Sequence, residues 1–267
     1  MATIVSFHAH PDDESIQTAG TLVKAARAGH RTVLVFATRG EHGEVADGFL
    51  DPGETLAARR ELECFRSAEV LGAQRVAFLD FVDSGMAGTP ENELVGSFWT
   101  ADVEVAAKRL ADLLEEEQAD VVTIYDPNGA YGHPDHVQVH RVGVRAAELA
   151  GTPVVLEATM NRDHLRRVIE LGKQRGHIPD DGVPDVGEDS TFGTPEDEIT
   201  HGIDVRDVLA EKRASMAAHG SQIAETSFFL TMPDEAFEAS FGWEWYIDRS
   251  REPGGDKVAD ILDGISG

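Results

Sequence analysis

Short apolar runs alternate with amphipathic segments through the first half of the chain. The runs predict buried strands at residues 4–7, 31–36, 76–79, 121–125 and 154–156. Between them, hydrophobic side chains recur at helical spacing and predict helices over residues 14–28, 54–71, 101–118 and 134–149. Strands that alternate with helices form parallel sheets covered on both faces. The pattern therefore predicts an α/β fold, a Rossmann-like three-layer sandwich with a mostly parallel sheet.

The pattern is less regular after residue 160. Residues 161–175 and 204–218 are predicted to be helices, the second with Asp204 as its N-terminal cap. Residues 176–198, rich in Gly, Pro and Asp, predict a surface loop, and residues 241–247 predict an edge strand. We expect a Rossmann-like core over residues 1–160 that carries the metal site argued below. Residues 161–267 form a smaller irregular extension that completes the fold and shapes the substrate pocket.

Composition narrows the classes of partner. With 49 acidic and 23 basic residues the formal net charge is −26, and a surface of this sign repels nucleic-acid phosphates and anionic lipids. We therefore expect a small-molecule partner and neither nucleic acid nor a membrane. The single Cys64 excludes an internal disulfide and is typical of a reducing cytoplasm. The sequence does not decide between a monomer and a homo-oligomer.

Two blocks of metal-ligand residues follow apolar strands that lie far apart in the sequence. Residues 10–14 read His-Pro-Asp-Asp-Glu, and residues 131–136 read Tyr-Gly-His-Pro-Asp-His. In open α/β folds, the ends of parallel strands meet at the sheet edge where ligands bind. A catalytic zinc has three protein ligands and a position for water. We predict that His10, Asp13 and His136 hold one Zn²⁺ per subunit, with another divalent metal such as Fe²⁺ as the alternative.

The other polar residues of the two blocks supply what a hydrolase needs. Asp12 is predicted to be the general base, and zinc lowers the pKa of a bound water towards about 7, so that a modest base suffices. His133 is the candidate for protonating the leaving amine or for stabilising the oxyanion. Tyr131 is the candidate for polarising the carbonyl. Asp135 is expected to orient either an imidazole or Asp12.

Both blocks resemble the signature of the LmbE-like, or PIG-L, zinc-dependent de-N-acetylases, and the resemblance extends across most of the chain. It includes the loop at residues 38–43, the helix pattern at residues 60–72 and the segment at residues 212–222. Residues 83–90 and 125–129 are closest to the actinobacterial branch that acts on mycothiol and its precursor. The chain departs from that branch at residues 38–39 and after residue 160, regions that shape the acyl and aglycone pockets.

This resemblance implies roles for single residues. It implies that the zinc ligands are His10, Asp13 and His136 and that the general base is Asp12. It also implies that His133 is the acid or oxyanion stabiliser and that Tyr131 is a mobile contact to the carbonyl. Arg60 and Asp83 match positions that hold the sugar part of the substrate. Glu41, in the loop at residues 38–43, is assigned with them to substrate binding.

We therefore expect a zinc-dependent hydrolase that removes an N-acyl group, chiefly N-acetyl, from an amino-sugar glycoside. Two alternatives stay open at this point. One is an amidase that acts on a thiol conjugate or a secondary metabolite, and the other is a catalytically silent metal-binding relative. The presence of Asp12 and His133 favours an enzyme, because a binding protein needs neither group.

Overall fold

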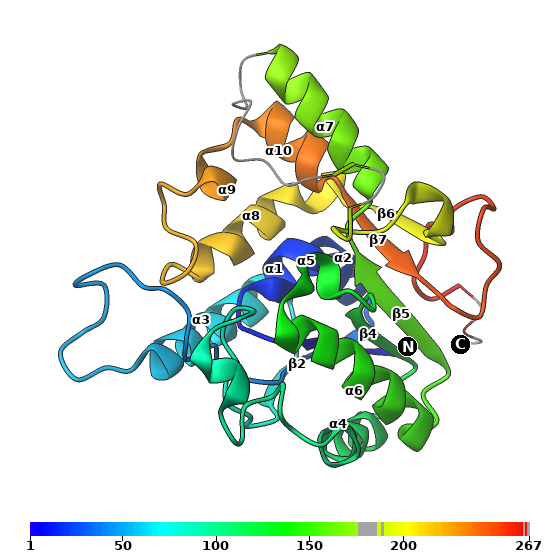
Figure 1. Ribbon diagram of the computed structural model, residues 1–267. Helices are drawn as coiled ribbons and strands as arrows, with labels where there is room; N and C mark the ends of the chain where they lie inside the picture. Colours follow the sequence, from blue (N-terminus) through cyan, green and yellow to red (C-terminus); the bar gives the residue numbers. More distant parts are fainter. Residues whose placement is uncertain (176–185, 188–189, 264, 266–267) are drawn as a thin grey trace.

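A seven-stranded sheet forms the centre of the protein, as seen in a computed structural model that describes residues 1–175, 186–187, 190–263 and 265. The strand order is β3-β2-β1-β4-β5-β7-β6 (Figure 1). Five strands run parallel: β1 (Thr3–His8), β2 (Arg31–Phe36), β3 (Arg75–Phe78), β4 (Val121–Tyr125) and β5 (Val154–Thr159). The last two, β7 (Trp243–Ile247) and β6 (His201–Asp204), pair antiparallel. The predicted mostly parallel α/β architecture is confirmed.

Helices cover both faces of this sheet (Figure 1). One face carries four helices that contact one another: α1 (Asp13–Gln17), α2 (Ala19–Arg27), α3 (Leu56–Leu71) and α8 (Leu209–Ala218). The other carries α4 (Val103–Glu117) and α6 (Pro134–Ala150), which pack together. Three further helices lie beyond α8: α7 (Arg162–Gln174), α9 (Phe228–Thr231) and α10 (Asp234–Phe241). Within the described residues, none of the helices combines the length and apolarity needed to cross a bilayer.

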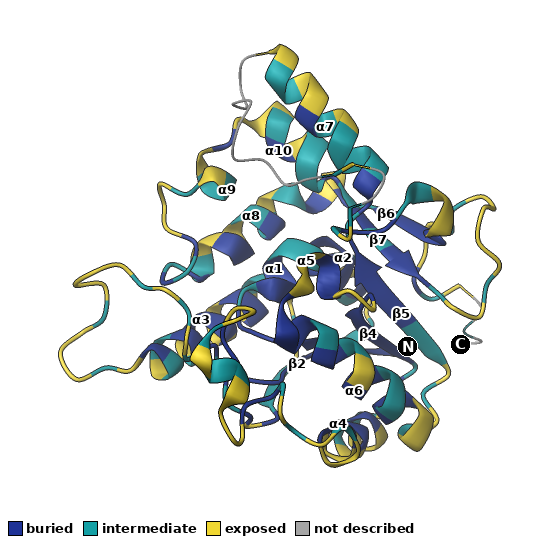
Figure 2. Ribbon diagram, in the orientation of Figure 1, coloured by how far each residue is buried: buried dark blue, intermediate teal, exposed yellow. Residues whose placement is uncertain are grey.

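The sheet is buried from both sides, and Figure 2 shows its central strands in the colour of buried residues. Every residue of β1 and of β4 is buried. Strands enclosed by two helical layers need apolar side chains on both faces, which explains why they are nearly continuous hydrophobic runs in the sequence. This regular signal is the reason that all five parallel strands were predictable.

Three local predictions differ from the structure. The helix predicted over residues 14–28 is two helices separated at Thr18, whose φ and ψ are −132° and −1° and whose hydroxyl bonds the Glu14 carbonyl oxygen. Asp204 ends β6, opposite Trp243, and its carboxylate accepts from the backbone N–H of Arg206, which begins the short helix η3 (Arg206–Val208). Helix α8 begins only at Leu209. The predicted edge strand is β7, but it lies between β5 and β6. Strand β6 is only four residues long, too short for a clear sequence pattern.

The remaining C-terminal predictions have mixed outcomes. The helix predicted over residues 161–175 is confirmed as α7, with Asn161 capping its start. Most of the loop predicted over residues 176–198 lies outside the described residues, although its end contains the short helix η2 (Glu196–Glu198). The sequence did not predict α9 or α10, which have four and eight residues.

Close packing of α6 on β4 depends on Gly143. A Cβ atom at this position would lie 2.3 Å from Cγ2 of Ile124, so Gly143→Ala forces the helix away from the strand. We expect a loss of about 1–3 kcal/mol in the free energy of unfolding, measured by urea denaturation. Gly255→Ala is the control, because its Cβ would meet nothing within 4 Å. Equal denaturation midpoints for the two variants would contradict this account of the packing.

Candidate active site

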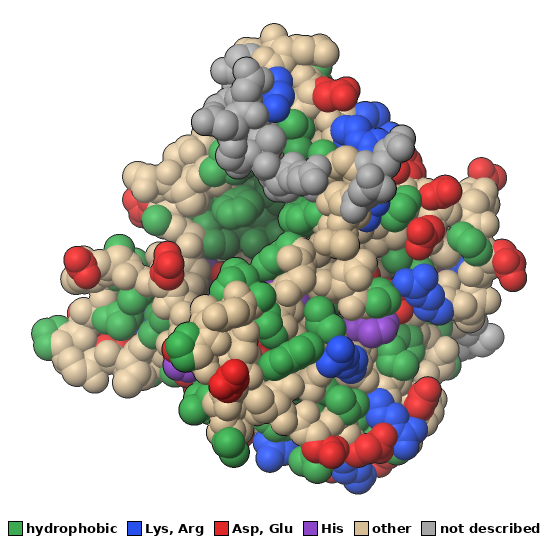
Figure 3. Space-filling model, viewed as in Figure 1, with side chains coloured by type: hydrophobic (Ala, Val, Ile, Leu, Met, Phe, Trp, Pro, Cys, Tyr) green, Lys and Arg blue, Asp and Glu red, His purple; other side chains and the backbone are tan. Residues whose placement is uncertain are grey.

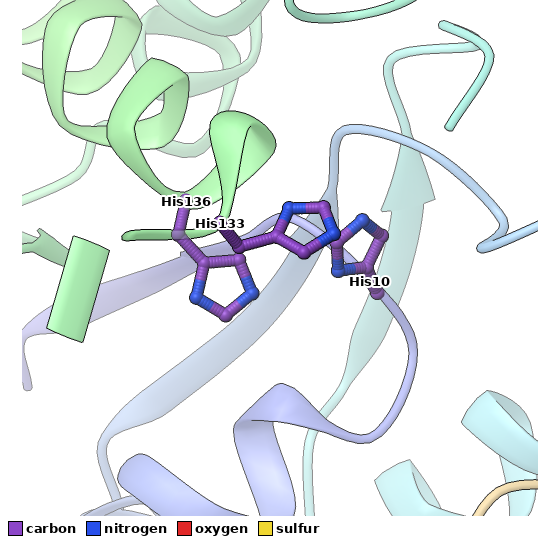
Figure 4. Close-up of side chains that lie close together, drawn as sticks. All are labelled: His10, His133 and His136. Carbon is purple, nitrogen blue, oxygen red and sulfur yellow. The ribbon is translucent and has the colours of Figure 1, made fainter. Parts of the chain in front are cut away.

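The two polar blocks meet because β1 and β4 are neighbours in the sheet. His10 lies just beyond the end of β1, after Ala9, and Asp13 opens α1. After β4 the chain passes through the short helix α5 (Gly129–Gly132), and His136 lies in the first turn of α6. Figure 4 shows the rings of His10, His133 and His136 close together at the ends of these strands.

Ligand atoms within 4.8 Å of one another come from His10, His133 and His136 in one group, and from His10, Asp83 and Asp135 in another. Asp13, the third residue of the predicted donor set, lies against His10 and His136. His136 Nε2 lies 3.3 Å from Asp13 Oδ1, and His10 Nδ1 lies 3.6 Å from Asp13 Oδ2. His136 is fully buried, and among the described residues neither of its ring nitrogens has a hydrogen-bond partner. A buried imidazole without partners is costly unless a ligand satisfies it. Two imidazoles and one carboxylate match the donors that zinc takes in catalytic sites, so the residues fit a divalent metal.

The carboxylates of Asp135 and Asp83 contact one ring nitrogen of His10 and so determine which nitrogen faces Asp13. The Nε2 atom donates to Asp135 Oδ2 at 3.1 Å and lies 3.4 Å from Asp83 Oδ1, which leaves Nδ1 facing Asp13. Burial by itself lowers the pKa of His10, but hydrogen bonds with Asp13, Asp135 and Asp83 outweigh it and raise the pKa. Surroundings that favour a proton here also favour a metal cation. Of the two orienting tasks left open for Asp135, the geometry supports the one on an imidazole.

Asp12 has the environment of a general base. It has a positive φ of 111° with ψ of −28°, and its carboxylate accepts a hydrogen bond of 3.1 Å from Arg60. Burial raises the pKa of Asp12 to about 6, with Arg60 opposing the rise and Asp13 adding to it. A carboxylate with a pKa close to neutral is suited to accept a proton and to return it.

His133 is neutral near pH 7, and its ring proton lies on Nε2. Its Nδ1 accepts the Asp135 backbone N–H at 3.1 Å, as the cap of α6, which leaves the proton on Nε2. Burial and the neighbouring His10 and His136 lower the pKa of His133 to about 4. A neutral Nε2–H is a hydrogen-bond donor, so the geometry favours the oxyanion role over that of a resting acid.

Tyr131 stands at the rim of the cluster. Its ring centroid lies 4.9 Å from that of His136 and 6.3 Å from that of His133, and the residue is 45% exposed. It lies in the kinked helix α5, where Ala130 has φ of 61° and ψ of −58°. This position, close to the imidazoles yet open to solvent, is compatible with the predicted contact to a substrate carbonyl.

The residues assigned to sugar binding lie nearby but bond within the protein. Arg60 is buried and donates to the carbonyl oxygens of Pro11 and Gly40 as well as to Asp12. The carboxylate of Asp83 accepts from the backbone N–H groups of His42 and Gly85, and that of Glu41 accepts from the backbone N–H of Asp83 itself. Substrate contact by Arg60, Asp83 and Glu41 therefore stays a prediction.

Two groups near the site were not predicted to be functional. Glu14 is fully buried, and its carboxylate accepts hydrogen bonds from the Asp12 backbone N–H at 3.0 Å and from His219 Nε2 at 2.5 Å. His219 comes from the chain after α8. The available signals were the acidic residue that ends the first block and the His in the segment at residues 212–222.

The surface beside α8, α9 and α10 is hollowed and lined with hydrophobic side chains (Figure 3). These helices and the segments between them hold a second apolar cluster whose buried members are Met216, Ile223, Met232 and Phe237. Ile16 packs against this cluster from α1, the same short helix that begins with Asp13. The C-terminal part thus brings apolar surface close to Asp13, one of the predicted metal ligands.

An open α/β sheet with a buried His and carboxylate cluster, and beside it a carboxylate paired with Arg60, defines a metal-site hydrolase. A family model described as "PIG-L: GlcNAc-PI de-N-acetylase" matches residues 5–147, which include both blocks. The chain belongs to this family. The expected family resemblance is confirmed, and with it the expected class, a deacetylase-type amide hydrolase.

Similar proteins support this assignment over nearly the whole length. The chain is 37% identical to the 1D-myo-inositol 2-acetamido-2-deoxy-alpha-D-glucopyranoside deacetylase of Acidothermus cellulolyticus, covering 92% of this chain and 88% of that protein. The deacetylase of the same name from Thermomonospora curvata is also 37% identical, with 94% and 92% covered. Among solved structures, N,N'-diacetylchitobiose deacetylase from Pyrococcus horikoshii has a TM-score of 0.56 at 23% identity, covering 94% and 84%, and it supports the fold.

Proposed function

We propose that this enzyme removes the N-acetyl group from an N-acetylglucosaminyl glycoside in the cytoplasm, with one bound Zn²⁺. The observation that carries the proposal is the placement of Asp12, a carboxylate with a raised pKa, directly beside the donor set of His10, Asp13 and His136. The names of the Acidothermus and Thermomonospora relatives support the amino-sugar part of the substrate.

The metal would be held by His10, Asp13 and His136, and when bound it would polarise the amide carbonyl and acidify a water molecule. Asp12 accepts the proton that the attacking water loses. Because its pKa is near 6, Asp12 then passes the proton to the departing amine. The Nε2–H of His133 donates to the carbonyl oxygen as negative charge develops there, and the Tyr131 hydroxyl is a second donor from the rim.

Selectivity for a sugar tests this function. We expect the enzyme to release acetate from N-acetylglucosaminyl glycosides with a kcat/KM roughly 10²-fold or more above that for N-acetylcyclohexylamine. A site built to bind hydroxyl groups leaves buried polar atoms unpaired when the ring lacks them. Acetate release is measured enzymatically with zinc added. Equal turnover of both amides would contradict the sugar assignment while leaving the amide hydrolase class in place.

A second candidate is an amidase whose substrate carries an apolar group, such as a thiol conjugate or a secondary metabolite. The apolar hollow beside α8, α9 and α10 favours it, since a sugar alone does not require such a surface. We also propose that the C-terminal extension forms the part of the substrate pocket that decides between these two substrates. Measuring kcat/KM for N-acetylglucosaminides with and without an apolar aglycone distinguishes the two substrate classes.

A further inference from the structure

The peptide bond between Pro11 and Asp12 is held at both of its ends. Its carbonyl oxygen, which belongs to Pro11, accepts a hydrogen bond from the guanidinium of Arg60. Its N–H, which belongs to Asp12, donates to Glu14 Oε2 at 3.0 Å. The orientation of this peptide sets φ of Asp12, which is 111°. A non-glycine residue occupies that region only when its surroundings impose it, and here two side chains do so.

Both holding side chains are themselves fixed by residues 219–222, which follow α8. His219 Nε2 donates to Glu14 Oε1 at 2.5 Å, and both residues are fully buried. Gln222 Oε1 accepts from Arg60 Nη1 at 3.3 Å. The 219–222 segment therefore contacts both Glu14 and Arg60, the two side chains that hold the Pro11–Asp12 peptide, which we call the catalytic turn.

The 219–222 segment is in turn anchored to the core. Glu63, on α3, accepts hydrogen bonds from the Ser221 backbone N–H at 2.9 Å and from the Ser221 hydroxyl at 2.6 Å. Ser67, one turn further along α3, donates to the same Glu14 oxygen that His219 binds. A rigid support of this kind can fix the position of a side chain that it does not touch.

We propose that His219 and Gln222 are positioning residues for Asp12, acting through Glu14 and Arg60. They hold the Pro11–Asp12 peptide so that the Asp12 carboxylate is directed at the attacking water. This inference rests on the proposed function, because it assigns Asp12 as the base. It gives the C-terminal extension a part in the chemistry besides shaping the pocket.

A double-mutant cycle tests this proposal. His219→Leu removes the donor to Glu14, and we expect kcat to fall roughly 10²-fold, the scale of a misplaced catalytic group, with KM and zinc content nearly unchanged. His219→Gln keeps an N–H at the position of Nε2, so most of kcat is expected to return. In an Asp12→Asn background, His219→Leu is expected to cost no further kcat, because its effect passes through Asp12.

A matched variant distinguishes loss of the Asp12 position from a general disturbance of the fold. His201→Gln replaces another buried imidazole, on β6, which bonds Thr200, and is expected to leave kcat unchanged. Additive losses of kcat in the cycle, or an equal loss in His219→Gln and His219→Leu, would overturn the proposal. Should His219→Leu not accumulate as folded protein, the same cycle is run with Gln222→Ala, whose side chain is only partly buried.

A structural readout distinguishes failure of this inference from failure of the proposed function. Crystal structures of His219→Leu and His201→Gln are compared at residue 12. We expect φ of Asp12 to relax from its positive value in the first variant only. If the native enzyme releases no acetate from N-acetylglucosaminides, the substrate proposal fails, while this comparison still decides the inference: an unchanged turn in His219→Leu would overturn it.

Discussion

Asp12→Asn is expected to lower kcat roughly 10²–10⁴-fold, the usual contribution of a general base, while metal content and fold are retained. The amide oxygen of Asn can still accept the hydrogen bond from Arg60, so that only the capacity to take a proton is lost. The measurement is steady-state kinetics together with elemental analysis for zinc. Asp13→Asn is the matched variant, and it is expected to lose metal instead. An exchange of these two phenotypes would reverse the assignments of the adjacent carboxylates.

The assignment of Asp12 as the base also predicts the direction in which the rate changes with pH. Asp12 acts as a base only when it is ionised, so the rate is expected to fall as the pH drops below its pKa of about 6. A bound cation stabilises the carboxylate form and moves this limb to lower pH. In Asp12→Asn the limb that belongs to Asp12 is expected to disappear.

His136→Ala is expected to remove most of the bound metal and nearly all activity. The variant deletes one of two imidazoles in the donor set and leaves Asp13 without a partner that lies 3.3 Å away in the native protein. Elemental analysis and acetate release measure the two losses. His140→Ala is the control: it lies on the same helix four residues later, but its ring bonds the Tyr125 carbonyl oxygen. Retention of stoichiometric zinc by His136→Ala would contradict the assigned ligand set.

The sequence was sufficient for the parts of the molecule that rest on short-range patterns. The parallel strands are largely apolar, and each polar block comes shortly after the end of a strand, so their meeting at one sheet edge was predictable before any coordinates. The pairing of β1 with β4 then brings His10 and His136 together as expected.

Long-range contacts were beyond the reach of such patterns. No local periodicity signals that β6 pairs with β7 at the edge of the sheet, since its four residues are too few. The sequence likewise did not show that Arg60 is enclosed by Pro11, Asp12 and Gly40, and the predicted sugar contact came from its position in a motif alone. The partnership of Glu14 with His219 depends on how α8 packs on α1, which only the fold reveals.

The bond between Glu14 and His219 joins residues that are 205 positions apart in the sequence. During synthesis, His10, Asp13 and His136 all leave the ribosome well before His219 does. These three residues can therefore meet in a growing chain in which Glu14 still lacks His219. A chain shortened before His219 would contain all three of these residues and lack the contact between His219 and Glu14.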